Sequence, residues 1–223
     1  MKKPHLTVAV PTHDMPNKVY FLRRLFDSLW NQSFQDFEIV VTDNSEDYDL
    51  EEVCEWYRTG IRYIRNPRKG MAQNTNEAIK QSKGDLIKIL YMDDYLAHDN
   101  SLRNIVNKFK GQWMVSGCKH SFDGNKVFNT HWPEYSNDLR TGNNTIGSPS
   151  VLTIKNKDPL MFDEEMTWLL DCDYYHRLYE KHGKPTILED VNVIIGLGAH
   201  QATNILSDEL KVNEQTYLTQ KYA

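Results

Sequence analysis

Short apolar runs and amphipathic segments alternate along the first half of the chain. Residues 6–10 form an apolar run that predicts a buried strand, and residues 19–30 place Leu22, Leu25 and Leu29 on one face of a helix. Such alternation favours a mostly parallel sheet with helices on both faces and right-handed crossovers. The same pattern predicts strands over residues 37–42, 61–64 and 85–92 and helices over residues 50–57 and 71–82.

The second half has a weaker periodicity. We expect an α/β fold with one domain over residues 1–223, in which about residues 1–112 form the regular half and about residues 113–223 a mixed half. The patterns here predict strands over residues 113–118, 150–154 and 186–195, helices over residues 171–182 and 208–220, and a loop or hairpin over residues 122–144.

Composition describes an ordinary globular protein. The chain has 223 residues, of which 39% are hydrophobic and 26% charged, and its net charge of −5 argues against a nucleic-acid-binding surface. Its three cysteines have no paired spacing, so neither a disulfide framework nor a zinc site is indicated. The segment before the first strand is too short for a signal peptide, and no apolar run approaches a membrane span. We therefore expect a soluble, cytoplasmic protein.

Polar residues follow three of the predicted strands. The first strand ends in Pro11-Thr12-His13-Asp14, the second in Asp43-Asn44-Ser45, and the fourth in Asp93-Asp94. The carboxyl ends of parallel strands meet at one edge of a sheet, where ligands bind. Adjacent buried carboxylates need a compensating cation, and Mg²⁺ or Mn²⁺ also binds phosphate oxygens. The pattern predicts a site for a metal-accompanied nucleotide or sugar phosphate; the alternative is a solvated acidic turn.

Other phosphate-binding patterns are missing from the sequence. No Gly-x-Gly-x-x-Gly follows the first strand, and the chain contains no Gly-x-x-x-x-Gly-Lys-Ser/Thr. A dinucleotide-binding dehydrogenase and a P-loop ATPase are therefore disfavoured. Four basic residues within residues 62–69 either face an anionic ligand or are solvated.

Two aspartates begin the helix predicted from residue 171. Asp171 and Asp173 point to nearly opposite sides of a helix, and Asp173 stands four residues before Arg177, the spacing of an ion pair. Asp171 has no such partner, so it is the candidate general base, although an acidic residue also suits a helix N-terminus. His200 follows a glycine-containing stretch and is either a metal ligand or a plain polar residue.

Taken in order, these residues resemble a family 2 glycosyltransferase of the GT-A fold, over about residues 6–203. That resemblance implies a Rossmann-like, mostly parallel sheet and a mixed acceptor-side half. The segments that carry it are residues 8–14, 25–33, 37–45, 70–76 with Ala78, Gly84 and Asp85, then 93–94, 147–150, 168–171 and 200–203.

The resemblance also implies roles. The donor is a nucleoside-diphosphate sugar, for which Asp43 accepts an N–H of the base, usually uracil, and the acceptor is a glycan or another hydroxyl compound. Mn²⁺ or Mg²⁺ is held chiefly by Asp94, with Asp93 and His200, and Asp171 is the catalytic base of an inverting transfer, with Asp173 as the alternative. The residues implied in nucleotide binding are Pro11, Thr12, His13, Asp43, Asn66, Gly70, Met71, Asn74 and Asp93.

Departures from the family pattern leave two other functions open. Met92, Thr75 and Leu170 replace an acidic residue, an Arg and a Glu that many members have at these positions. A non-catalytic nucleotide-sugar or glycan-binding module of the same fold is one alternative. A sugar nucleotidyltransferase is the other, but it normally has a glycine-rich basic loop that residues 11–17 lack. In the loop over residues 122–144, Trp132 and Tyr135 either contact the acceptor or pack internally.

Overall fold

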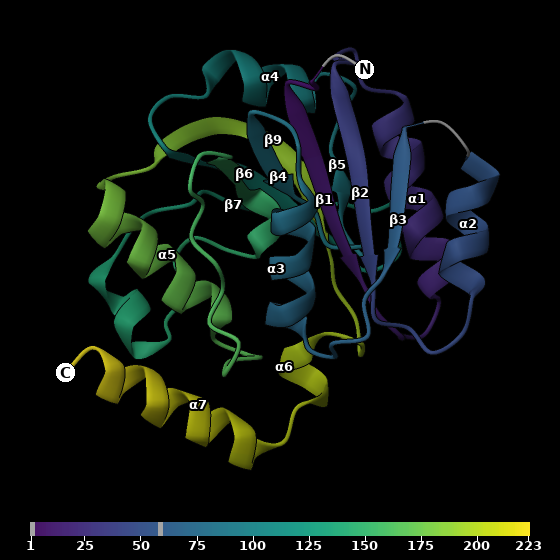
Figure 1. Ribbon diagram of the computed structural model, residues 1–223. Helices are drawn as coiled ribbons and strands as arrows, with labels where there is room; N and C mark the ends of the chain where they lie inside the picture. Colours follow the sequence, from purple (N-terminus) through teal and green to yellow (C-terminus); the bar gives the residue numbers. More distant parts are fainter. Residues whose placement is uncertain (1–2, 58–59) are drawn as a thin grey trace.

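A single nine-stranded sheet forms the centre of the computed structural model, which describes residues 3–57 and 60–223. The strand order is β3-β2-β1-β4-β8-β6-β9-β5, with β7 paired to β6 (Figure 1). The strands are β1 (Leu6–Thr12), β2 (Phe37–Asp43), β3 (Ile61–Arg65), β4 (Leu86–Ile89), β5 (Tyr95–Leu96), β6 (Trp113–Ser121), β7 (Phe128–His131), β8 (Leu152–Lys155) and β9 (Thr186–Gly196).

The first four strands of this order are parallel, because β1 pairs with β2 and β4, and β2 pairs with β3. The chain passes from β1 to β2 to β3 in one direction across the sheet and then returns to β4 on the other side of β1. Because the crossovers are right-handed, α1 and α2 lie on one face of these strands and α3 on the other (Figure 1). The helices are α1 (Lys18–Trp30), α2 (Asp49–Tyr57), α3 (Met71–Gln81), α4 (Ser101–Lys108), α5 (Leu170–His182), α6 (Ala202–Ile205) and α7 (Asp208–Lys221), with short 3₁₀ turns η1 (Asn137–Thr141) and η2 (Pro149–Val151).

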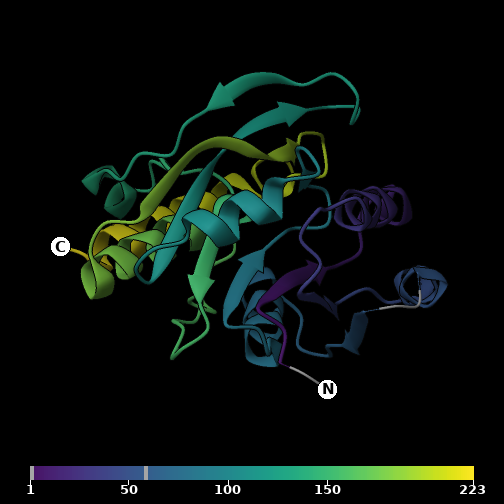
Figure 2. The same ribbon diagram turned by 90° about the horizontal axis from the view of Figure 1, so that it is seen from above.

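The second half of the sheet is mixed. β8 is antiparallel to both β4 and β6, whereas β6 and β9 are parallel. The β6–β7 hairpin extends along one side of the molecule, as the view from above shows (Figure 2). The predicted α/β class, with a parallel first half and a mixed second half, is confirmed. Both halves belong to one sheet, since β4 pairs directly with β8.

The strand predicted over residues 85–92 ends at Ile89, and the following residues turn. Asp94 N donates to Tyr91 O in this turn, at 3.0 Å, so the adjacent aspartates stand on a bend beyond the strand. Three short elements, α4, β5 and α6, were not predicted. β5 and α6 have two and four residues, too few for a periodic pattern to identify them, whereas the eight-residue α4 was overlooked. No helix in residues 3–57 or 60–223 combines the length and the apolar character that spanning a bilayer needs.

Candidate functional site

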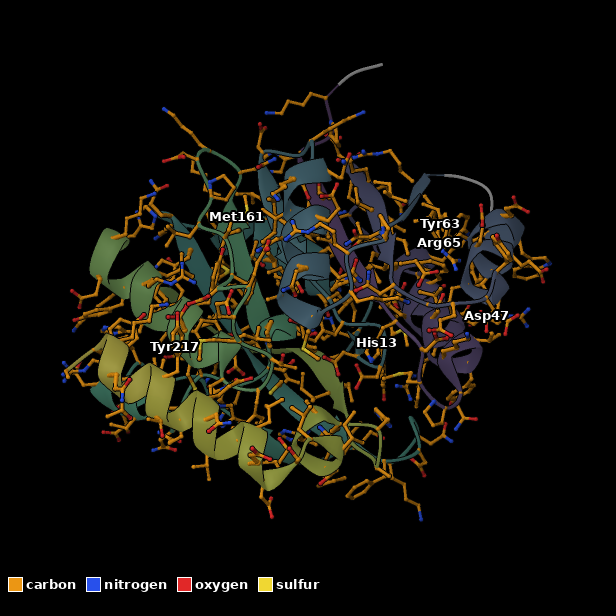
Figure 3. The ribbon with its side chains drawn as sticks, turned by 60° about the horizontal axis from the view of Figure 1, so that its bottom comes forward. His13, Asp47, Tyr63, Arg65, Met161 and Tyr217 are labelled. Atoms are coloured by element: carbon orange, nitrogen blue, oxygen red, sulfur yellow. The ribbon has the colours of Figure 1, made fainter. Side chains whose placement is uncertain are left out.

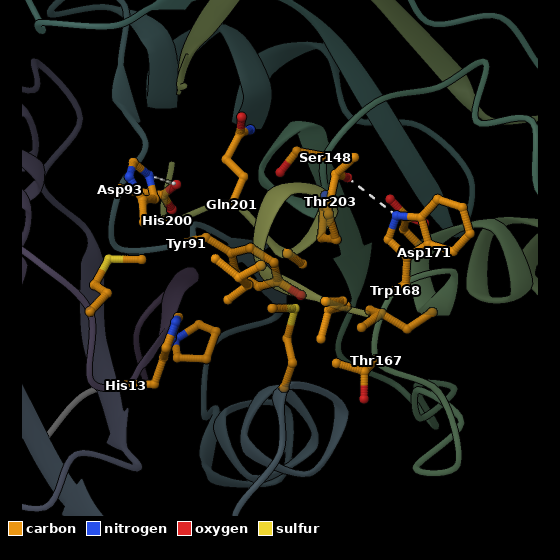
Figure 4. Close-up of a pocket in the computed structure, with 18 of the residues that line it drawn as sticks. His13, Tyr91, Asp93, Ser148, Thr167, Trp168, Asp171, His200, Gln201 and Thr203 are labelled. Carbon is orange, nitrogen blue, oxygen red and sulfur yellow. Dashed lines mark hydrogen bonds and ion pairs between the residues drawn. The ribbon is translucent and has the colours of Figure 1, made fainter. Parts of the chain in front are cut away.

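A cavity of about 800 Å³ opens between the ends of β1 and β4 on one side and the start of α5 on the other. Figure 4 shows Asp93 with His200 at one side of this cavity, Asp171 with Trp168 at the other, and Tyr91 between them. The residues singled out in the sequence that line the cavity are Pro11, His13, Gly70, Met71, Asn74, Asp93, Asp94, Asp171 and His200.

Thr12 and Asp43 lie behind the cavity wall. Asp43 is fully buried, and Thr12 Oγ1 donates to its Oδ1 at 3.0 Å. Its remaining lone pairs accept from Ser45 N at 2.9 Å, Ser45 Oγ at 2.6 Å and Tyr63 OH at 2.7 Å. A buried carboxylate needs such partners, and here the neighbouring strand ends supply all of them. The structure does not bring Thr12 and Asp43 to the cavity, so their contact with a nucleotide stays a prediction.

Asn66 also stands behind the wall, within a chain of buried amides. Its Nδ2 donates to Asn74 Oδ1 at 3.0 Å, and Asn74 Nδ2 donates to the carbonyls of Thr12 and Thr42 at 2.8 and 2.9 Å. Asn74 therefore joins α3 to the ends of β1 and β2 while one side of it reaches the cavity. Asn44, one of the polar residues at the end of the second predicted strand, lines the cavity beside this network.

Only one of the four basic residues in 62–69, Lys69, lines the cavity. Arg62 Nη1 donates to Gln81 Oε1 at 3.0 Å, Arg65 Nη2 donates to Glu46 O at 2.8 Å, and Arg68 pairs with Glu164. Among the described residues this segment therefore brings a single cation to the site.

Asp93 and His200 form a pair inside the cavity. Their Oδ2 and Nε2 atoms are 3.1 Å apart, and 17% and 9% of the two side chains are exposed. The ring of His200 packs on Phe21, 5.0 Å between centroids, and a Cβ at Gly198 would stand 2.7 Å from its Nδ1. The missing side chain at residue 198 thus makes room for the imidazole. The sequence favoured Asp94 as the main metal ligand, but His200 faces Asp93.

Asp94 is enclosed by the protein. Gly196 N donates to its Oδ1 at 2.8 Å, and Ser148 Oγ donates to its Oδ2 at 3.4 Å. Burial, and then the neighbouring Asp93 carboxylate, raise the pKa of Asp94 well above its usual range. Only glycine fits at residue 196, because a Cβ there would stand 2.2 Å from Asp93 O. The backbone thus approaches the two aspartates closely and holds their turn in place.

Lys88 lies beneath this turn. Its side chain is fully buried, its Nζ donates to Ser150 O, and burial lowers its pKa to about 7 even though Asp94 opposes that shift. Tyr91 N in turn donates to Ser150 Oγ, at 2.8 Å. A buried amine therefore supports the aspartate turn through η2.

We expect Lys88→Met to raise the free energy of unfolding at pH 7 by about 2–4 kcal/mol, because a lysine kept neutral in the fold is protonated in the unfolded chain. The free energy of unfolding of the wild type then rises with pH between about 7 and 10.5. The amount by which the variant exceeds the wild type shrinks by about 3 kcal/mol between pH 7 and pH 9.5. Urea titrations at the two pH values measure this difference. The exposed Lys80→Met is the control, and an advantage that is the same at both values would contradict the assignment.

Asp171 lines the opposite side of the cavity. Cys172 N donates to its Oδ1 and Asn144 Nδ2 to its Oδ2, both at 2.7 Å. Burial raises the pKa of Asp171 to about 6, and the two hydrogen bonds act in the other direction. A carboxylate of this pKa is ionised at neutral pH and still accepts a proton readily, as a general base must.

Asp173, the alternative base, does not line the cavity. It is fully buried and forms the predicted pair with Arg177, whose Nε donates to Asp173 Oδ2 at 2.7 Å. Lys221 Nζ and Tyr222 OH reach its Oδ1 at 2.7 and 2.5 Å. These partners hold Asp173 in a structural role, and the geometry leaves Asp171 as the carboxylate that substrate can reach.

Glu214 on α7 holds the segment that leads into α5. Its carboxylate accepts the backbone N–H groups of Thr167, Trp168 and Leu169 at 2.7, 2.8 and 2.9 Å. Trp168 Nε1 also donates to Thr203 Oγ1 at 3.2 Å, the bond drawn across Figure 4. In Figure 3, α7 runs below α5, with Tyr217 labelled on it. Sequence reasoning missed this role of Glu214, because nothing local distinguishes it from other glutamates of a charged helix.

Few protein ligands for a metal are available. No group of three His, Cys, Asp or Glu side chains able to hold an ion occurs among residues 3–57 and 60–223. Asp93 and His200 do offer a carboxylate oxygen and an imidazole nitrogen that face the cavity together. Such a pair suits an ion that takes its other ligands from phosphate and water. His13, beside them, is held towards its neutral form, since burial lowers its pKa against the pull of Asp93 and Asp14.

Known proteins resemble this chain in sequence. The model of glycosyl transferase family 2 matches residues 7–177. A chondroitin synthase from Pasteurella multocida is 28% identical over 148 residues, which are 62% of this chain and 15% of that protein. A GalNAc(5)-diNAcBac-PP-undecaprenol beta-1,3-glucosyltransferase from Campylobacter jejuni is 32% identical over 98 residues, 42% of this chain and 31% of that protein. The chain therefore spans less than a third of the length of either relative.

Solved structures share the fold. S. aureus TarS 1–349 in complex with UDP-GlcNAc superposes with a TM-score of 0.71 at 22% identity, covering 96% of this chain and 65% of that one. The mannosyltransferase PcManGT from Pyrobaculum calidifontis, in complex with GDP-Man and Mn²⁺, gives 0.60 at 17% identity, covering 88% and 58%. These likenesses confirm the GT-A-like α/β fold. Since the family model covers more than half of the chain, the protein belongs to glycosyl transferase family 2.

Proposed function

We propose that the chain transfers a sugar from a UDP-sugar to an acceptor hydroxyl with inversion at the anomeric carbon, together with Mn²⁺ or Mg²⁺. The observation that carries this proposal is the placement of Asp93 with His200 and of Asp171 on opposite sides of one cavity. A leaving diphosphate and an attacking hydroxyl need opposite sides of the sugar in a single displacement. The complexes of TarS with UDP and UDP-GlcNAc support a uridine donor.

Asp93 and His200 would hold the metal, with Asp94 supporting the turn that carries Asp93. When bound, the ion supplies Lewis-acid neutralisation of the charge that grows on the leaving diphosphate. Lys69 contributes a further cation at the cavity wall. We assign Asp93 in place of Asp94 as the principal ligand, because Asp93 faces His200 in the cavity whereas Asp94 accepts hydrogen bonds from Gly196 N and Ser148 Oγ.

Asp171 takes the proton from the acceptor hydroxyl as that oxygen attacks the anomeric carbon. The new C–O bond forms on the face opposite the diphosphate, the bond from that carbon to the diphosphate oxygen breaks, and UDP leaves with the electron pair. Asn144 fixes the carboxylate of Asp171 with a 2.7 Å hydrogen bond. Both reactants are thus oriented before the reaction, which is the main advantage of binding them in one cavity.

The test incubates the purified chain with UDP-GlcNAc, UDP-glucose, UDP-galactose or GDP-mannose and Mn²⁺, and measures release of the nucleoside diphosphate. UDP release from at least one uridine donor, lost on adding a chelator and restored by excess Mn²⁺, is the expected result. Binding of these sugars without turnover would indicate a non-catalytic module instead. Formation of a UDP-sugar from UTP and a sugar 1-phosphate would indicate a nucleotidyltransferase.

A further inference from the structure

A second hollow, of about 310 Å³, lies beside the β6–β7 hairpin. Its walls include His120 from β6, Asn129 and His131 from β7, and Asn144 and Ser148 from the loop that follows. Asn144 and Ser148 also line the main cavity, so the two hollows adjoin there. Since Asn144 Nδ2 is bonded to Asp171 Oδ2, Asn144 stands between the second hollow and the candidate base.

The lining of this hollow is polar but carries no formal charge from Asp, Glu, Lys or Arg among the described residues. His120 Nδ1 lies 2.9 Å from Asn129 O, and His131 Nε2 lies 3.1 Å from Ile146 O. A carbonyl oxygen only accepts, so each ring donates from that nitrogen, and the other nitrogen of the neutral ring remains an acceptor. The hollow therefore offers neutral hydrogen-bonding groups, which suit hydroxyls. A phosphate or carboxylate would call for an arginine or lysine.

Two exposed aromatic rings belong to the same hairpin. Phe122 and Phe128 stack with 5.3 Å between ring centroids, and 70% and 39% of the two residues are exposed. His120 lies next to Phe128, at 6.3 Å between centroids, and pairs with it across the strands. A bound pyranose packs its C–H face on aromatic rings and bonds its hydroxyls to polar atoms. This part of the hairpin offers both, an apolar ring pair beside neutral polar groups.

The two aromatic residues that the sequence suggested for the acceptor both make packing contacts, while half of Trp132 remains exposed. Trp132 covers Gly117, where a Cβ would stand 2.4 Å from its ring. Tyr135 stacks on Tyr179 at 3.6 Å between centroids. Among the described residues neither of them lines either hollow, and nor do Phe122 and Phe128, but the Phe122–Phe128 pair adjoins the second hollow through His120, which lines it and lies beside Phe128.

We propose that the hollow beside β6–β7 binds the uncharged terminal pyranose of the acceptor, with the next sugar lying on Phe122 and Phe128. This proposal rests on the proposed function and names the acceptor class for it. The terminal sugar turns one hydroxyl past Asn144 towards Asp171.

Saturation-transfer NMR of the full chain with saturating UDP tests the site. The probes are methyl β-glycosides of glucose, galactose and N-acetylglucosamine, their β-linked disaccharides, and methyl β-glucuronide as the charged comparison. At least one uncharged probe should bind and the glucuronide should not. The double variant Phe122→Ala/Phe128→Ala should weaken disaccharide binding by about 10-fold, the loss expected for one stacking contact. His131→Ala should weaken the monosaccharide as well.

The exposed Trp56→Ala on α2 is the matched control and should leave probe binding unchanged. Equal probe affinity in wild type and both hairpin variants would overturn the proposal, as would preferred binding of the glucuronide or no binding of any uncharged probe. UDP release from UDP-sugars is measured on the same samples. If it proceeds while the sugar probes fail to bind, the acceptor site alone is wrong; if no donor is bound or cleaved, the proposed function fails first.

Discussion

Asp171→Asn is expected to lower the rate of sugar transfer by about 10²–10⁴-fold, the usual contribution of a general base, while making the protein more stable at neutral pH. The two effects have one cause. Burial raises the pKa of Asp171 to about 6, so the fold holds a carboxylate that would be ionised more easily in the unfolded chain. Asparagine removes the buried charge together with the proton acceptor.

The sign of the stability change follows from the two protonation states. Below the unfolded pKa of 3.8 the carboxyl is neutral in both states, and above about 6 it is charged in both, with the full penalty of burying it. The contribution of Asp171 to the free energy of unfolding of the wild type therefore falls as the pH rises from 3.8 to about 6. The free energy of unfolding of Asp171→Asn, relative to that of the wild type, should increase by about 2 kcal/mol between pH 4.5 and pH 8. The pKa of Asp171 in the fold already includes the hydrogen bond from Asn144, so comparing two pH values isolates the effect of the titration.

Asp173→Asn is the matched control on the same helix. It breaks a buried pair with Arg177 and Lys221, so it should lower the free energy of unfolding by about 3–5 kcal/mol.

For the variant at residue 171, kcat/KM and urea unfolding at both pH values are the measurements. Wild-type transfer by Asp171→Asn would exclude it as the base. In wild type, kcat/KM should fall about tenfold per pH unit below about pH 6, as Asp171 becomes protonated.

Asp93→Asn is expected to raise the Mn²⁺ concentration for half-maximal activity by about 100-fold or more, whereas Asp94→Asn should raise it by less than about 10-fold. Asp93 shares the cavity with His200 at 3.1 Å, so in the proposed site its replacement removes one of the two side chains assigned to the metal. Asp94 accepts hydrogen bonds from Gly196 N and Ser148 Oγ, and in the same proposal its replacement acts mainly by displacing Asp93.

Mn²⁺ binding in the presence of UDP, followed by electron paramagnetic resonance, separates a change in metal affinity from a change in catalysis. His200→Ala should resemble Asp93→Asn in this experiment. The reverse order of effects, with Asp94→Asn the more damaging variant, would restore the assignment that the sequence alone favoured.

The parts of the fold that could be predicted have long, regular patterns. The helix expected over residues 19–30 begins one residue earlier, and the terminal helix expected over residues 208–220 ends one residue later. The apolar positions of the first helix repeat over several turns, whereas the second was recognised as a charged segment without such a repeat. α6 has four residues and β5 two, and both are fixed by contacts with distant segments. Such elements have no sequence period of their own.

The candidate site was predicted where local spacing carries the information. Four residues separate Asp173 from Arg177, and this spacing indicated a pair that the structure confirms. Which of two adjacent aspartates faces His200 depends on a turn whose direction is set by Gly196, about a hundred residues away. The nucleotide contact of Asp43 rests on the resemblance and stays a prediction, whereas its hydrogen bonds from Thr12, Ser45 and Tyr63 could not be predicted from the sequence. Those partners come together only in the folded sheet.

The contacts of α7 connect the two substrates. The segment that carries His200 and Thr203 continues directly into α7, whose Glu214 holds the backbone just before Asp171, and Trp168 touches Thr203. In the proposed site, a diphosphate that displaces His200 would therefore also act on the segment that positions Asp171. Two ligands joined through one element change each other's affinity by the same factor. Under the proposed function, saturation with UDP should accordingly tighten acceptor binding, and acceptor should tighten UDP binding by an equal ratio, so loosening α7 should weaken both effects together.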